Sequence, residues 1–300
     1  MEDRLYKFAR LIDAGSFTKA AAVMHISQPA LTTAIKKLER ELHTELLIRD
    51  SHTFKLTAAG AIAYETAKQL GIQAHNLKLR LAEAGDRTVP LNLGAIDSIA
   101  ELLFVHGDNL RDLERGTRLS LTVDNSTQLI KYIEHDELDI ALIAKPTSLP
   151  AVLLSIELGE EPLVFVTAAA REAKTIEAMQ QQRLHSFLSY NLHSHTERLV
   201  RRHFEKHDIV LKPSFHSTSP EIMLQLVLAR RGSAVLPYLL VKPYLEKKQL
   251  ATIQVGDSCV VTRPIVSIHR AGKSLPDQVT KLLASSRTQL DLLTAEAKLL

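Results

Sequence analysis

The chain has 300 residues, of which 45% are hydrophobic and 24% charged, and a formal net charge of +3. This composition is typical of a folded protein and excludes a disordered or fibrous chain. Single cores stop growing at roughly 250 to 300 residues, so the length predicts more than one domain. Because the net charge is small, any contact with nucleic acid requires a local basic patch.

The features that bear on location predict a cytoplasmic protein. The N-terminus, MEDRLYKFAR, lacks the basic, apolar and small-residue order of a secretory signal. No apolar run approaches the roughly 18 residues of a membrane span, so no membrane partner is expected. The single cysteine, Cys259, cannot form an internal disulfide and is expected to be a buried structural thiol.

The first part of the chain is predicted to form short helices. Apolar residues between Leu5 and Ile12 recur at helical spacing, and Gly15 interrupts this pattern before a second helix that starts near Thr18. Three consecutive alanines at 20–22 would let another helix cross at close range.

A third helix, in SQPALTTAIKKLEREL, has two chemically different faces. Ser27 is a candidate N-cap, and Pro29 fits the first turn, where a missing N–H has no cost. The apolar residues of the core face follow at steps of four, three and four: Leu31, Ile35, Leu38 and Leu42. Short polar side chains near the helix start, with lysines a turn later, suit insertion into a major groove, although lysines alone are typical of any solvated surface. The candidate DNA-binding residues here are Ser27, Gln28, Pro29, Ala30, Thr32, Thr33, Lys36 and Lys37.

A polar hairpin, LLIRDSHTFKLT, follows this helix. It supplies Arg49, His52 and Lys55 beside a turn, which is the chemistry of a wing that lies on phosphates or in a minor groove. Residues 1–58 are therefore predicted to be a winged helix-turn-helix DNA-binding domain.

Residues 59–88 are predicted to form a linker helix that mediates dimerisation. Neither proline nor a turn cluster interrupts the chain from Ala58 to Arg87, and apolar positions alternate steps of four and three, the spacing of a heptad seam. A helix that lies on its own domain is the alternative. The seam residues are Ala63, Ala67, Leu70, Ala74, Leu77, Leu81 and Ala84.

The rest of the chain, 89–300, is predicted to be an α/β domain. The segment GDRTVP at 85–90 reads as a linker, and strand-like and helical segments alternate after it, which indicates βαβ units and a parallel sheet.

These segments resemble the LysR-type transcriptional regulators. The resemblance is carried by GSFTKAAAVMHISQPALTTAIKKLERELHTELLIRD, by LTAAG and by the domain order. It implies an α/β protein with an N-terminal all-α winged helix-turn-helix, a linker helix and a two-lobed, periplasmic-binding-protein-like (type 2) effector domain. It also implies a regulator, without enzymatic activity or cofactor, that binds double-stranded promoter DNA as a dimer or tetramer and is able to contact RNA polymerase.

The sequence departs from the family pattern at a few positions. Thr33 and Ala34 stand where Arg and Gln are frequent, so the resemblance leaves the operator sequence open. His43 replaces the usual glycine after the recognition helix, so a different backbone conformation is expected at that helix end. Leu47 replaces a usual Phe, which implies a repacked core.

The resemblance places a small ligand between lobe I, about 89–161 and 265–300, and lobe II, about 162–264. Free N–H groups at helix starts favour an anion, so a small organic or inorganic anion is the expected effector. Each of the residues involved is also typical of an ordinary helix cap. The expected effector-binding residues are Ser98, Asn125, Ser126, Thr127, Asn191, His193, Ser217, Thr218 and Ser219.

Other interpretations stay open. A solute-binding receptor would need an export signal. An enzyme with Ser126 or Cys259 as nucleophile would turn over a substrate, although GxSxG, HExxH and a phosphate loop are all missing. A regulator with a purely structural cleft would bind no member of a ligand panel.

Four histidines raise the question of a metal. His203 and His207 lie four residues apart on a predicted helix, and His193 and His195 precede them. Because no cysteine or acidic cluster completes such a site, no metal is expected, and the group is interpreted as a basic surface or as effector contacts.

Overall fold

The computed structural model describes residues 1–49, 54–84, 88–107, 109–114, 117–181, 183–192 and 194–300. Two predicted site residues, His52 and His193, lie outside these ranges. The chain forms two compact units, Met1–Gly85 with Gly272–Ser274 and Asp86–Ala271 with Leu275–Leu300.

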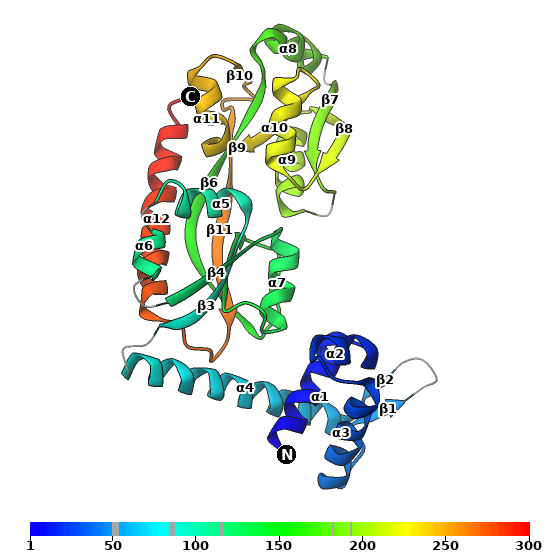
Figure 1. The fold of residues 1–300 in the computed structure, drawn as a ribbon. Helices are drawn as coiled ribbons and strands as arrows, with labels where there is room; N and C mark the ends of the chain where they lie inside the picture. Colours follow the sequence, from blue (N-terminus) through cyan, green and yellow to red (C-terminus); the bar gives the residue numbers. More distant parts are fainter. Residues whose placement is uncertain (50–53, 85–87, 108, 115–116, 182, 193) are drawn as a thin grey trace. The chain divides into compact units, whose positions relative to one another are not determined.

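The N-terminal unit is a small helical domain with a two-stranded hairpin (Figure 1). Its core holds the fully buried side chains Phe8, Leu11, Leu31, Ile35 and Leu38. These residues recur every three or four positions, so α1 and α3 each bury one face, as the apolar spacing predicts. The elements are α1 (Glu2–Ala14), α2 (Phe17–Val23), α3 (Gln28–Glu41), β1 (Leu47–Arg49), β2 (Phe54–Leu56) and α4 (Ala58–Ala84).

The helix boundaries in this unit follow local sequence signals. α1 ends at Gly15, whose φ of 66° lies in the left-handed region that glycine adopts without steric cost. Ser27 caps α3 by accepting a hydrogen bond from the N–H of Ala30 at 3.3 Å, and Pro29 lies in the first turn. Both predictions are confirmed.

The expectation of a different conformation at the end of α3 is wrong. His43 has a φ of 50°, which is the left-handed conformation that a glycine usually supplies. The N–H of His43 donates to the carbonyl of Arg40 (3.3 Å), and that of Thr44 donates to the carbonyl of Glu39 (3.1 Å). These two bonds form a Schellman motif, which satisfies the last carbonyls of the helix and holds His43 in its strained conformation.

Helix α4 divides the predicted heptad seam into two parts. Ala63 and Ala67 are buried in the core of the N-terminal unit. Leu70, Leu77 and Leu81 are exposed by 42%, 57% and 61% of their surface. The seam is therefore not one continuous contact: its first turns anchor α4 to its own unit, and its later turns leave an apolar stripe open.

The second unit contains two lobes that share strands β6 (Leu153–Ala168) and β11 (Val260–Arg270) (Figure 1). Lobe I contains β3 (Val89–Ala95), α5 (Asp97–Phe104), α6 (Asn109–Glu114), β4 (Thr117–Val123), α7 (Ser126–Glu134), β5 (Ile140–Ala144) and α12 (Asp277–Ala297). Lobe II contains α8 (Glu172–Gln180), β7 (Arg183–Tyr190), α9 (His195–Glu205), β8 (Val210–Ser217), α10 (Pro220–Leu228), β9 (Ser233–Pro237), α11 (Tyr238–Glu246) and β10 (Leu250–Thr252).

The described strands of this unit form one nine-stranded sheet in the order β4-β3-β5-β11-β6-β9-β7-β8, with β10 also paired to β6. The predicted parallel pairing is found inside each lobe, between β3 and its neighbours β4 and β5, and between β7 and its neighbours β8 and β9. The sheet as a whole is mixed, because β6 and β11 run antiparallel along the length of β11. These two strands carry the chain between the lobes.

Candidate DNA-recognition helix and inter-lobe pocket

The outer face of α3 carries the predicted DNA-binding side chains. Thr32 is half-buried, and the rest of the set on this helix, including Gln28, Thr33, Lys36 and Lys37, is exposed. Lys55 on β2 is exposed as well. The backbone of Arg49 lies in β1, paired with that of Phe54 in β2. The structure thus presents two lysines and short polar side chains on one accessible helix.

Polar contacts fix α3 within the N-terminal unit. The carboxylate of Glu39 accepts hydrogen bonds from the backbone N–H groups of Leu46 (3.1 Å) and Leu47 (3.3 Å), which ties α3 to the first strand of the hairpin. Arg4 on α1 forms an ion pair with Glu41 at the end of α3. With its inner face packed and its end tied, α3 can present its outer face as a rigid surface to a groove of DNA.

A cavity of about 260 Å³ lies between the two lobes of the second unit. The first turns of α5 and α7 from lobe I and of α9 and α10 from lobe II reach it. We call it the inter-lobe pocket. Its lining residues are Ile96, Asp97, Ser98, Asp124, Asn125, Ser126, Thr127, Tyr190, Asn191, Ser194, His195, Thr196, Ser217, Thr218, Pro220 and Arg263.

Most of the predicted effector-binding residues lie in this pocket. The structure brings together Ser98, Asn125, Ser126, Thr127, Asn191, Ser217 and Thr218. Ser219 has another role: its hydroxyl caps α10 by accepting from the N–H of Ile222 at 3.3 Å. Asn125 has both roles: it lines the pocket, and its side chain caps α7 by accepting a hydrogen bond from the N–H of Gln128 (3.1 Å).

Arg263 is the central residue that the sequence analysis missed. It is 7% exposed and lies on β11, and its Nε donates to Glu161 at 2.5 Å. Its other nitrogens donate to Ser98 of lobe I (2.9 Å) and Thr196 of lobe II (2.8 Å). Burial disfavours its charge, but Glu161, Tyr190 and Asp97 together outweigh this effect and raise the pKa of Arg263, so the guanidinium stays charged. One side chain therefore bonds to both lobes.

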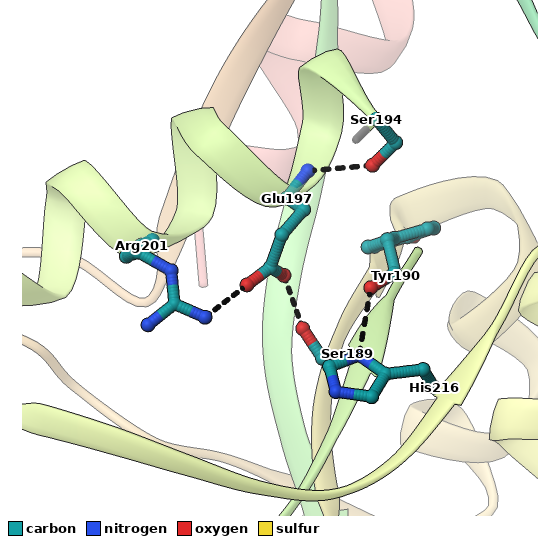
Figure 2. Close-up of polar contacts among 6 residues, drawn as sticks. All are labelled: Ser189, Tyr190, Ser194, Glu197, Arg201 and His216. Atoms are coloured by element: carbon teal, nitrogen blue, oxygen red, sulfur yellow. Dashed lines mark hydrogen bonds and ion pairs between the residues drawn. The ribbon is translucent and has the colours of Figure 1, made fainter. Parts of the chain in front are cut away.

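The first turn of α9 is held against β7 by a buried carboxylate (Figure 2). Glu197, 1% exposed, accepts from the hydroxyl of Ser189 and from Arg201 (2.6 Å). Ser194 caps the same helix by accepting from the N–H of Glu197 at 3.0 Å. This network fixes the position at which α9 meets the pocket.

Two further residues of the pocket, Asp97 and Tyr190, have raised pKa values. Burial raises the pKa of Asp97, an effect that Arg263 opposes and the nearby carboxylate of Asp124 reinforces. Burial also raises the pKa of Tyr190, whose hydroxyl has no hydrogen-bond partner among the described residues. The only contact drawn for Tyr190 in Figure 2 is made by its carbonyl oxygen, which accepts from Nδ1 of His216 at 3.2 Å.

The histidines do not form a metal site within the described part of the chain, where no group of three or more His, Cys, Asp or Glu residues is placed to hold an ion. The ring centroids of His203, on α9, and His207, two residues after its end, lie 5.2 Å apart. His195 lines the pocket, and burial together with the charge of Arg198 lowers its pKa, so its ring is neutral at pH 7. The expectation of a basic surface or effector contacts stays a prediction.

The sequence offered little signal for the missed residues. Tyr190 and Arg263 stand at the end of a strand and inside a strand, where neighbouring residues resemble any other strand. Asp97 is the first residue of α5 and Asp124 directly follows β4; only their positions at or beside helix starts could have added them to the expected set.

The fold and these two surfaces define a helix-turn-helix protein with a ligand-binding α/β domain. Residues 3–61 match the bacterial regulatory helix-turn-helix protein, lysR family, and residues 84–291 match the LysR substrate binding domain. The chain therefore belongs to the LysR family, a family of transcriptional regulators and not of enzymes.

Individual relatives agree with this assignment. The Hca operon transcriptional activator HcaR of Escherichia coli (strain K12) is 34% identical over 160 residues, which are 53% of this chain and about half, 54%, of that relative. A full-length variant of OxyR from Pseudomonas aeruginosa has a similar structure, with a TM-score of 0.66, 25% identity and coverage of 96% and 97% of the two chains. Vibrio fischeri DarR, solved in complex with DNA, shares the fold at a TM-score of 0.54 and 22% identity, over 96% of this chain and 99% of DarR.

No helix in the described ranges is both long enough and apolar enough to cross a membrane.

Proposed function

We propose that this protein binds promoter DNA as a dimer or tetramer in the cytoplasm, and that a small anion in the inter-lobe pocket controls its regulatory output. The observation that carries this proposal is the meeting of four helix N-termini, two from each lobe, on one cavity of about 260 Å³. The first N–H groups of a helix lack intrahelical partners and favour negative charge. This cavity suits a small carboxylate or a sulfate-like ion.

The bonds of Arg263 supply a route from the pocket to the rest of the domain. Because Ser98 and Thr196 share one guanidinium, a ligand that changes the separation of the lobes must alter at least one of these bonds. A ligand can shift a conformational equilibrium only through such differential contacts. We propose that this shift changes the spacing of paired winged helices, and with it the bend of the DNA and the contact with RNA polymerase.

The exposed stripe of α4 supports the oligomeric part of the proposal. Leu70, Leu77 and Leu81 lie on one side of the helix at heptad spacing. Apolar side chains so placed are buried when two such helices pair. Vibrio fischeri DarR, whose structure includes DNA, shares the fold and supports the DNA-binding part.

Footprinting on the DNA upstream of the protein's own gene tests the proposal. We expect protection of two or more half-sites separated by a helical turn or a multiple of it, with affinity that falls steeply as salt rises. Organic acids and sulfate are then tested for thermal stabilisation of the full-length protein and for a changed footprint. Absent or salt-insensitive protection would contradict the DNA-binding part, and a panel without any stabilising ligand would contradict the effector part.

A further inference from the structure

The two walls of the inter-lobe pocket differ in charge. Both acidic lining residues, Asp97 at the start of α5 and Asp124 before α7, belong to lobe I. Lobe II contributes only neutral groups among the described lining residues, since His195 is neutral at pH 7. A ligand that contacts both walls therefore meets negative charge on one side only.

The protein leaves this negative charge largely uncompensated. Arg263 is the only cation among the described lining residues, and its Nε is already engaged by Glu161. The carboxylate of Asp97 accepts no hydrogen bond from the described residues, and Arg263 acts on it only through its charge. Asp124 accepts only through Oδ1, from the backbone N–H (2.7 Å) and side chain (2.8 Å) of Asn125, so its second carboxylate oxygen is open toward the described residues. The carboxylates of Glu161 and Asp97 thus both act on one guanidinium, and that of Asp124 acts on Asp97.

An acidic residue in a first helical turn is common by itself, because it matches the helix dipole. Tyr190 is a second and independent sign of a ligand. Its side chain lines the pocket at 6% exposure, and its hydroxyl has no partner among the described residues. The charges of Arg263, Glu161 and Asp97 all act on this hydroxyl, so it lies beside the acidic wall. Buried hydroxyl groups are almost always hydrogen-bonded, so a partner is missing here.

The wall of lobe II has the opposite preference. The first turns of α9 and α10 point at the cavity, and their capping serines, Ser194 and Ser219, each satisfy only one N–H of the helix start. In α9 the N–H groups of His195 and Thr196 remain to donate to an anion; in α10 only that of Glu221 remains, because Pro220 has no N–H. By contrast, the start of α7 lies directly beside Asp124, which makes it the poorer place for negative charge.

We propose that the effector is a zwitterion of amino-acid size. Its ammonium group binds Asp97, Asp124 and the hydroxyl of Tyr190 on one side, and its carboxylate binds the first turns of α9 and α10 on the other. This inference rests on the proposed function: it keeps a carboxylate as the negative group of the effector and adds an ammonium group, so the molecule as a whole is neutral and not an anion. Because the two charges of the ligand engage different lobes, such a molecule holds both lobes at one separation, which a simple carboxylate would not do.

Calorimetry on the full-length protein tests this with pairs of ligands that differ only in the amino group. Suitable pairs are alanine and propionate, leucine and isocaproate, phenylalanine and hydrocinnamate, and glutamate and glutarate. At least one amino acid is expected to bind roughly 10- to 100-fold more tightly than its partner, the ratio expected for charge-assisted hydrogen bonds. Asp97→Asn and Asp124→Asn should each weaken the binding of the amino acid and leave the binding of the matched acid without the amino group unchanged.

Tyr190→Phe separates ligand binding from folding. In the free protein it removes an unpartnered hydroxyl, so the unfolding temperature should stay the same or rise, while the amino acid binds more weakly. Glu137→Gln is the control, because it removes an exposed carboxylate of lobe I outside the pocket. If acids without an amino group bind as tightly as amino acids, and Asp97→Asn affects both equally, the zwitterion is wrong and the proposed function stands. If neither member of any pair binds and sulfate does not bind either, both the zwitterion and the effector part of the proposed function fail.

Discussion

Arg263 on β11 and Glu161 on β6 form an ion pair of 2.5 Å in which the two side chains are 9% and 3% exposed. The pair lies on the two strands that connect the lobes and joins Ser98 and Thr196 through the same guanidinium. Attraction in a buried setting is strong, but so is the cost of desolvation, so the pair matters most when one partner is removed.

A double-mutant cycle on this pair should show strong coupling. Arg263→Met or Glu161→Leu alone leaves one buried charge unpaired and should lower the free energy of unfolding by about 3 to 5 kcal/mol. The double variant should recover much of this loss, because no charge is left unpaired. Urea unfolding followed by circular dichroism measures all four proteins. Single and double variants whose losses simply add would show that the two side chains act independently.

The lysines of α3 should set the salt dependence of DNA binding. Lys36→Ala combined with Lys37→Ala should reduce the slope of log affinity against log salt by about 0.9 for each phosphate that the protein no longer neutralises. Fluorescence anisotropy on the footprinted operator gives this slope. Lys247→Ala, a change of charge at an exposed position after α11, should leave the slope unchanged. Equal effects of both changes would mean that α3 does not face the phosphates.

Leu77 and Leu81 should be needed for association. Changing each to Glu places a charge in the exposed stripe of α4 and should shift the protein from oligomer to monomer, because a desolvated charge opposes helix pairing. Sedimentation equilibrium measures the mass. Gln69→Glu adds the same charge at an exposed position on a different side of α4 and should keep the oligomer. A monomeric parent protein, or an oligomer that tolerates both leucine changes, would exclude α4 as the interface.

The left-handed residues that follow α1 and α3 should respond in opposite directions. His43→Gly removes a Cβ from a φ of 50° and should raise the free energy of unfolding of the N-terminal unit by about 1 kcal/mol. Gly15→Ala introduces that strain at a φ of 66° and should lower the free energy of unfolding by a similar amount. The loss should be no larger, because no atom lies within 4 Å of the added Cβ to clash with it. Thermal melts of the two variants check both signs. A loss of stability in His43→Gly would mean that the imidazole makes a compensating contact.

Cys259 should be a poor redox sensor. It is 3% exposed, and burial raises the pKa of its thiol, while a hydrogen bond with Thr252 opposes this shift. A raised pKa means less thiolate at neutral pH, so alkylation by iodoacetamide should be slow at pH 7 and faster as pH rises. Mass spectrometry of native and urea-unfolded protein gives the two rates. Fast native alkylation, or loss of DNA binding after peroxide treatment, would contradict this prediction.

The predictions that held depended on local signals. The cap at Ser27, the glycine at the end of α1 and the apolar face of α3 each involve residues a few positions apart, so the sequence contains all the partners. Some elements have weak local patterns: the strand β8 is exposed along much of its length, and α11 contains Pro243. The end of α3 was misjudged because His43 follows the conformation that the surrounding hydrogen bonds demand.

The order of the domains and the recognition helix could be predicted from the residues in chain order, and the helix starts around the pocket followed from the family resemblance. Which of those starts face one cavity, and which residues complete it, depends on the packing of distant segments. Arg263 and Ser98 are 165 positions apart, and Tyr190 and Asp97 line one pocket only because β6 and β11 bring two lobes together. The same holds for α4, where packing against α1 buries Ala67 and leaves Leu77 open. Charge balance and burial depend on all neighbours of a residue, and most of these are distant in the chain.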